Sequence, residues 1–295
     1  FMRALLLAES AHRALPNDAE PFNYLALATR GLGKKREAAE FYRQATVINP
    51  RGRTYWRNLI SLLAELRQVD ECTAAMRQYR DVATPQIFEN DTSYSQFVLS
   101  GELLRDPERG TAAERVRWYW RARRFADLVA LVKTLPPEII TESSEALEIR
   151  CRESDAWNRL GRGAEAEAAA KAALALAEKL QSAPEIGPTE KPGWMALALA
   201  RNGRADEAIA AAQRHVGATS AETQLGRRWP REIVLAETCA WLNRPRECIE
   251  LLAKLLRVPS GLTVPMLKVD PTWDNVREDA GFKALLADPK NSAPL

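Results

Sequence analysis

Residues 19–50 read AEPFNYLALATRGLGKKREAAEFYRQATVINP. Two amphipathic runs flank a Gly-Leu-Gly-Lys turn. We expect helices over residues 19–31 and 34–48, because apolar residues recur in both runs at intervals of three and four. The turn requires a close approach of the backbone and a left-handed residue, which Gly31 and Gly33 can supply. The stretch therefore predicts two antiparallel helices joined by a tight turn.

The spacing of the prolines and apolar residues indicates a repeat. Pro16 and Pro50 are 34 residues apart, and residues 53–84 follow the pattern of the first unit with Arg67 and Gln68 in place of the turn glycines. The shared apolar positions are Phe22, Leu25, Ala26, Ala38, Tyr42 and Ala45 in the first unit and Trp56, Leu59, Ile60, Cys72, Met76 and Tyr79 in the second. This pattern resembles the tetratricopeptide repeat, a 34-residue helix–turn–helix unit. The resemblance implies an all-α, right-handed superhelix of stacked antiparallel helix pairs.

The rest of the chain is predicted to extend the array. Residues 3–15 correspond to the second helix of a repeat that lacks its first helix, so we expect the natural protein to continue upstream. A helix is expected over 90–105, from an Asn90-Asp91-Thr92 cap to a break at Asp106-Pro107. Further helix pairs are expected at 111–122 with 125–135, and within 141–181, 193–216 and 229–259. These predictions give an array over 1–259, with a candidate internal break at the proline-rich residues 182–192 and a polar connector at 217–228, and a separate tail over 260–295.

The tail has a pattern of its own. Residues 267–286 read LKVDPTWDNVREDAGFKALL. This resembles the ending of tetratricopeptide arms in bacterial multidomain signalling proteins, where the arm follows a kinase, an adenylate cyclase or a winged-helix regulator. The second half of that pattern is usually Asp-Pro-x-Phe, whereas this chain has Asp-Ala-Gly-Phe. We expect Asp270 to start a turn, and Trp273, Phe282 and Leu285 to cover the open end of the last helix pair.

Composition excludes several classes of function. The 42 basic and 39 acidic residues leave a net charge of +3, so nucleic acid is not expected as a partner. No metal site is expected, because the four cysteines form no C-x-x-C pair and there are only two histidines. No catalytic or cofactor-binding motif is present, and no apolar run reaches the ~20 residues needed to span a membrane. We therefore predict a chain that is not an enzyme, holds no cofactor and does not insert into a membrane.

The cysteines give a weak indication of compartment. Unpaired cysteines favour the cytoplasm, and an extracytoplasmic position stays open if a transmembrane helix precedes the chain. Cys72 and Cys248 occupy positions where the repeat places a small buried residue. Cys239 and Cys248 belong to the same helix pair, so the sequence leaves their disulfide status open.

The resemblance also assigns a binding surface, because the first helix of each repeat lines the concave groove in this family. In this register the groove residues with a binding role are Asn23, Arg30, Arg57 and Ser61. Their side chains could hold the backbone or the carboxylates of a peptide. The carboxylate clamp known in the family is not carried over, because Leu27 and Ser61 do not match it. The alternative interpretation is that all four are ordinary solvated side chains.

Residues 109–124 form a basic segment, with six arginines and one glutamate around Trp118, Tyr119 and Trp120. Arginines beside aromatic residues can bind anions, which makes an anionic-ligand patch one interpretation. The other is a helix pair with core aromatics and solvated arginines. The candidate patch residues are Arg115, Arg117, Arg121 and Arg124.

The sequence thus predicts a non-catalytic interaction scaffold. It would bind a peptide or a partner domain in its groove and act as the sensor or docking arm of a larger signalling protein. The alternative is a structural array that self-associates or packs on its own upstream effector domain, with no external ligand.

Overall fold

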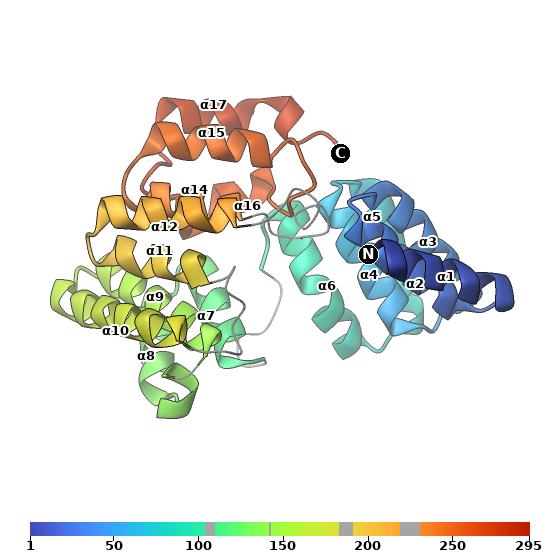
Figure 1. Cartoon of the computed structure of the whole chain (residues 1–295), viewed down its shortest axis with the longest axis horizontal. Helices are drawn as coiled ribbons and strands as arrows, with labels where there is room; N and C mark the ends of the chain where they lie inside the picture. Colours follow the sequence, from blue (N-terminus) through green and yellow to red (C-terminus); the bar gives the residue numbers. More distant parts are fainter. Residues whose placement is uncertain (104–109, 142, 183–190, 219–230) are drawn as a thin grey trace.

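The computed structural model confirms the all-α class. It describes residues 1–103, 110–141, 143–182, 191–218 and 231–295, and every regular element within them is helical. Six antiparallel pairs occur in these residues (Figure 1): α2 (Ala19–Gly31) with α3 (Lys35–Ile48), α4 (Arg53–Glu65) with α5 (Val69–Val82), α7 (Ala112–Arg121) with α8 (Phe125–Thr134), α9 (Ser144–Arg159) with α10 (Gly163–Gln181), α11 (Lys191–Arg201) with α12 (Ala205–Gly217), and α14 (Glu232–Trp241) with α15 (Pro245–Leu255).

The other helices stand outside these pairs. α1 (Met2–Ala14) precedes the first pair, and α6 (Pro85–Ser100) follows the second. The tail contains α16 (Val264–Val269) and α17 (Ala280–Ala287). Short 3₁₀ turns lie at η1 (Pro137–Ile140), η2 (Pro271–Trp273) and η3 (Pro289–Asn291).

All six pairs have the same turn. The second residue after the first helix is left-handed, and the residue that follows it donates its N–H to a carbonyl five residues earlier, which is the Schellman arrangement. The left-handed residues are Gly33, Arg67, Arg123, Gly161, Gly203 and Asn243, with φ between 53° and 80°. A left-handed backbone costs a residue with a Cβ roughly 1–2 kcal/mol. Arg67 and Arg123 both have this strained backbone, and the side chains of both form hydrogen bonds with the tail.

The predicted helix over 90–105 is wrong at both ends. α6 begins at Pro85, where the Thr84 hydroxyl accepts a hydrogen bond from the amide of Ile87, and it ends at Ser100, before the left-handed cap residue Gly101 with φ 77°. Proline closes a helix but also fits the first turn of the next one, because its missing N–H is not needed there. Pro85 plays the second role. The expected break at Asp106-Pro107 lies outside the described residues, as do most of the connector and residues 183–190 of the candidate internal break.

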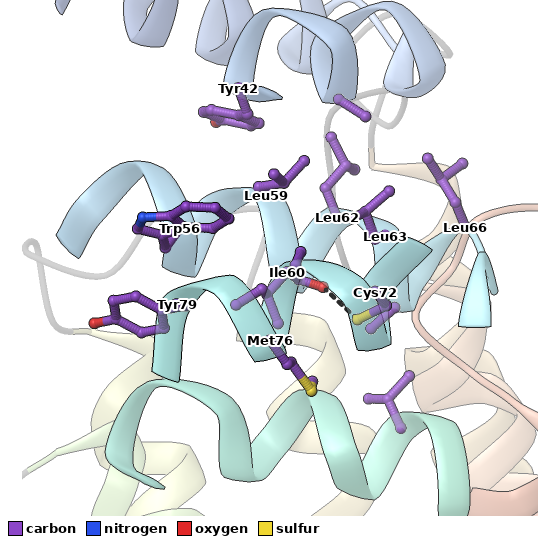
Figure 2. Packing of buried hydrophobic residues seen from close by; sticks show 14 of the residues in the cluster. Tyr42, Trp56, Leu59, Ile60, Leu62, Leu63, Leu66, Cys72, Met76 and Tyr79 are labelled. Atoms are coloured by element: carbon purple, nitrogen blue, oxygen red, sulfur yellow. Dashed lines mark hydrogen bonds between the residues drawn. The ribbon is translucent and has the colours of Figure 1, made fainter. Parts of the chain in front are cut away.

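The apolar positions of the first two repeats form the N-terminal core. Figure 2 shows Trp56 and Leu59 between Tyr42 on one side and Tyr79 on the other. The rings of Trp56 and Tyr79 stack with centroids 6.0 Å apart. The Cys72 thiol donates to the carbonyl of Ile60 at 3.4 Å. The residues that define the repeat in the sequence therefore hold its two helices together.

The tail covers the last pair, and it also reaches the other end of the array. Trp273, Phe282 and Leu285 lie in one apolar cluster with α14 and α15, as the pattern predicted. The short helix α16 packs against α6, which is distant in sequence (Figure 1). Met266 belongs to the N-terminal core, whereas Leu267 belongs to the C-terminal cluster. One helix of the tail thus joins the two halves of the molecule.

Candidate functional site

Three successive pairs end their first helix with an arginine, two residues before the left-handed position. Arg121 lies 3.5 Å from the carboxylate of Asp270, and Arg159 donates to Asn275 Oδ1 at 3.1 Å. Arg201 instead forms two bonds to Asp155, at 2.7 and 2.8 Å, and one of 3.3 Å to Glu237. Because these arginines occupy equivalent positions in consecutive pairs, we call Arg121, Arg159 and Arg201 the arginine ladder.

The tail segment 270–275 lies against this ladder. Trp120 donates its indole N–H toward Asp270 Oδ1 and the Thr272 hydroxyl, both at 3.2 Å. Arg152 donates to the same hydroxyl at 3.3 Å. Arg123 binds both oxygens of Asp274 at 2.7 Å. The first helices of the later pairs, together with the turn residue Arg123, therefore already bind an acidic segment of the same chain.

The two tail carboxylates are stabilised in their charged form. Burial alone would raise the pKa of Asp270, but the nearby guanidinium groups of Arg121 and Arg152 lower it below its usual value. At Asp274 the effect of burial is likewise outweighed, and hydrogen bonds from Arg123 and Arg277 hold the pKa below its usual value. Both groups are thus negatively charged at neutral pH.

In the first two repeats, the predicted groove residues Asn23 and Arg30 are already engaged. Arg30 pairs with the buried Glu65 at 2.6 Å, and the Asn23 amide oxygen accepts from Asn58 at 3.3 Å. A third hydrogen bond, of 2.6 Å, runs from the Tyr55 hydroxyl to Glu20. Each of the three bonds joins residues that are 35 positions apart in the sequence. These side chains connect the first helices of adjacent repeats, which leaves them poorly placed to hold a ligand.

The other two predicted groove residues remain accessible. Arg57 is exposed and Ser61 is half-buried, one turn apart on α4. Neither side chain forms a hydrogen bond or an ion pair with the part of the chain that the structure describes. Their role in binding stays a prediction.

The four candidate arginines of the basic segment do not converge on one site. Arg117 pairs with Glu148 of α9 at 2.6 Å, and Arg124 pairs with Asp127 of α8 at 2.6 Å. Arg121 belongs to the ladder and also lies 4.7 Å above the ring of Phe97. Arg115 is half-buried on α7. Three of the four thus bind carboxylates of three different segments of the chain.

Metal ligands, apolar helices and cysteines were the other features considered in the sequence. They contain no cluster of ligands that could hold a metal ion, and no helix among them is long and apolar enough to cross a membrane. All four cysteines are buried free thiols, including Cys239 and Cys248. Burial raises the pKa of Cys151 and Cys239 to about 11, and that of Cys72 and Cys248 to about 12.

The sequence analysis does not predict the ladder or its contacts with the tail, although the sequence contains a signal for them. Aligning the pairs on their left-handed turn residues places Arg121, Arg159 and Arg201 in one column. Alignment on the apolar pattern, which fades after residue 85, does not show this column.

No model of a known protein family matches the chain, and no curated protein matches it. Among solved structures, the tetratricopeptide-repeat domain of P58(IPK) is similar at 13% sequence identity, with 98% of this chain and 92% of that chain covered and a TM-score of 0.28.

Proposed function

We propose that the protein is a non-catalytic interaction scaffold that holds an acidic peptide of a partner against the first helices of its N-terminal repeats. One observation carries this proposal: the array binds its own segment 270–275 through Arg121 and Arg159 at the ends of first helices and through Arg123 in the turn that follows the first of them. Charge-assisted bonds of this kind contribute about 1.5–3 kcal/mol each. The same type of surface is therefore suited to an acidic peptide from outside.

The two halves of the array differ in whether the polar side chains on their first helices are available to bind an external peptide. Arg121 and Arg159 of the ladder already bind the tail, whose neighbouring side chains Trp273 and Val276 are buried. On α4, by contrast, Arg57 is exposed and Ser61 is half-buried, and neither side chain forms a hydrogen bond or an ion pair within the described chain. Arg57 would bind a carboxylate of the peptide, and Ser61 would bind its backbone.

A peptide-display selection on the immobilised full chain tests this proposal. We expect the recovered peptides to contain Asp or Glu, and Arg57→Glu to weaken them at least tenfold in fluorescence anisotropy. Arg77→Glu is the matched control, because Arg77 is exposed on the second helix of the same pair. Recovered peptides that bind the Arg57→Glu and Arg77→Glu variants equally would refute the proposal.

We also propose that the scaffold is the docking arm of a larger signalling protein in the bacterial cytoplasm. The resemblance of residues 267–286 to the ending of such arms supports the first part, and four buried free thiols support the compartment. The sequence encoded upstream tests the arm: a kinase, cyclase or DNA-binding domain is expected there, and a start codon at Met2 would contradict it.

A further inference from the structure

A cavity of ≈ 400 Å³ lies between the end of α5 and the length of α6. Arg80 and the cap residue Ala83 form one wall, and residues of α6 from Pro85 to Gln96 form the other. These α6 residues are three and four positions apart, so they share one face of the helix over about 16 Å. The volume falls within the range of roughly 300–1,000 Å³ that is usual for small-molecule sites.

The cavity exists because α6 has no second helix among the residues that the structure describes. In the preceding pair, the second helix α5 covers Trp56 and Ile60 of α4, through a ring stack and a thiol hydrogen bond. α4 begins at residue 53 and α6 at residue 85, which is 32 residues later. The counterparts of Trp56 and Ile60 in α6 are therefore Phe88 and Thr92, and both line the cavity. An apolar position that is covered in one pair is thus polar where the cavity is open.

Two opposite charges lie at one end of the cavity. The guanidinium of Arg80 lies 4.7 Å from the centroid of the Phe88 ring, and Glu89 follows Phe88 on α6. Both charged side chains are exposed, and neither forms a hydrogen bond or an ion pair with any residue in the described ranges. Since the two charges do not neutralise each other, each can form a charge-assisted hydrogen bond with a ligand.

The other end of the cavity is polar and uncharged. Ser93 lies one turn beyond Glu89, about 6 Å along α6, and its hydroxyl forms no hydrogen bond within the described part of the chain. The Gln96 amide nitrogen donates to the Thr92 hydroxyl at 3.4 Å, which leaves the amide oxygen as an acceptor. A ligand that extends along α6 would therefore meet a hydroxyl and an amide at this end.

We propose that this cavity binds a free α-amino acid with a neutral polar side chain. Its carboxylate binds Arg80 and its ammonium group binds Glu89, because an α-amino acid carries both charges on one carbon. The aliphatic part of its side chain lies along Phe88, and the polar end bonds to Ser93 and Gln96. An apolar side chain would leave these two groups unpaired beside the ligand, which costs affinity.

This site goes beyond the proposed function and does not depend on it, because Arg57 is not among the residues that line the cavity. The acidic-peptide surface and the cavity can therefore each be absent without the other. Variants at Arg80 and Glu89 test only the cavity.

Isothermal titration calorimetry of the full chain with L-glutamine is the test. We expect saturable binding, weakened at least tenfold by Arg80→Gln and by Glu89→Gln. Arg77→Gln and Asp81→Asn are the matched controls, because both residues are exposed on α5 outside the cavity, and each should change the affinity less than twofold.

Three modified ligands assign the contacts. N-acetyl-L-glutamine lacks the ammonium group, so it should bind at least tenfold more weakly than L-glutamine and be insensitive to Glu89→Gln. L-Glutaminamide lacks the carboxylate and should be insensitive to Arg80→Gln. L-Norleucine has a side chain of similar length without the polar end, and it should also bind at least tenfold more weakly.

Three results would overturn the inference. The first is the absence of heat from L-glutamine at millimolar concentration. The second is an affinity that Arg80→Gln and Glu89→Gln leave unchanged, or that norleucine equals, in chains with unaltered far-UV circular dichroism. The third is an acidic peptide that loses its binding in Arg80→Gln, which would assign the cavity to a peptide. Peptides that depend on Arg57 alone would leave the proposed function standing in the first two cases.

Discussion

Replacing the left-handed turn residue Arg67 with glycine tests how backbone strain and the tail contacts each contribute to the free energy of unfolding. Arg67 has φ 55°, and its guanidinium donates to the carbonyls of Leu256, Asn291 and Ala293. Burial first, and then the charge of Arg257, lower its pKa to about 10, so the group is charged at pH 7. Asn243→Gly is the matched control.

The control has the same backbone but none of the contacts. Asn243 has φ 53° at the equivalent turn position, is exposed, and forms no side-chain hydrogen bond with the described residues. Glycine relieves about 1 kcal/mol of left-handed strain at either site. At Asn243 no side-chain hydrogen bond is lost, so we expect Asn243→Gly to raise the free energy of unfolding by about 1 kcal/mol.

At Arg67 the lost hydrogen bonds outweigh the relief of strain. The bonds to Leu256 and Asn291 are the close ones, and the bond to Ala293 is long at 3.4 Å. Two bonds from a charged donor contribute about 3 kcal/mol together. After subtraction of about 1 kcal/mol for strain, Arg67→Gly should destabilise the protein by about 2 kcal/mol. The two variants should therefore differ by about 3 kcal/mol.

Urea unfolding followed by far-UV circular dichroism measures this difference. Hydrogen exchange at the Leu295 amide gives a local readout, because this amide donates to the Leu66 carbonyl at 2.9 Å. Its protection should fall in Arg67→Gly and stay unchanged in Asn243→Gly. An unfolding midpoint for Arg67→Gly equal to or above that of Asn243→Gly would refute the reasoning, since the tail contacts would then contribute nothing.

Three further predictions concern buried groups. Glu65→Ala leaves Arg30 and Lys35 without their buried carboxylate and should lower the free energy of unfolding by about 3–5 kcal/mol in urea; a loss below about 1 kcal/mol would contradict this. The pKa of Asp270 is lowered in the folded state, so its stabilisation is present above about pH 4 and is lost as the pH falls through the folded pKa; Asp270→Asn should flatten the fall of the unfolding midpoint below about pH 4, and parallel curves would argue against it. Phe282→Ala opens a cavity at a fully buried position and should cost about 3–5 kcal/mol in thermal unfolding, whereas a cost under about 1 kcal/mol would mean that the tail repacks.

The local part of the fold could be predicted because its signals are local. The 34-residue spacing from Pro16 to Pro50 and the aromatic residues Phe22 and Tyr42 define the helices of the first repeat, which the structure confirms. α6 was misplaced because the role of Pro85 depends on the residues around it. Thr84 caps the helix there, whereas the polar run at residue 90, which has the same cap residue types, lies inside the helix.

The long-range part could not be predicted in this way. Trp120 and Asp270 are 150 residues apart, and Arg67 and Asn291 are 224 apart. No periodicity within one segment reports such a contact. The contacts between the first helices of the N-terminal repeats could have been predicted. Arg30 and Glu65 differ by 35 positions, so the repeat alone places them on neighbouring first helices.

The position of α16 has a consequence for the order of events during synthesis. A simple solenoid can fold from its N-terminus as the ribosome extends the chain, since each repeat contacts only its neighbours. Here the N-terminal core includes Met266, and the Thr263 hydroxyl donates to the Val98 carbonyl. The first repeats therefore emerge with one face uncovered and must wait for residues beyond 260. Thr263 thus completes a contact with Val98, which is translated 165 residues earlier.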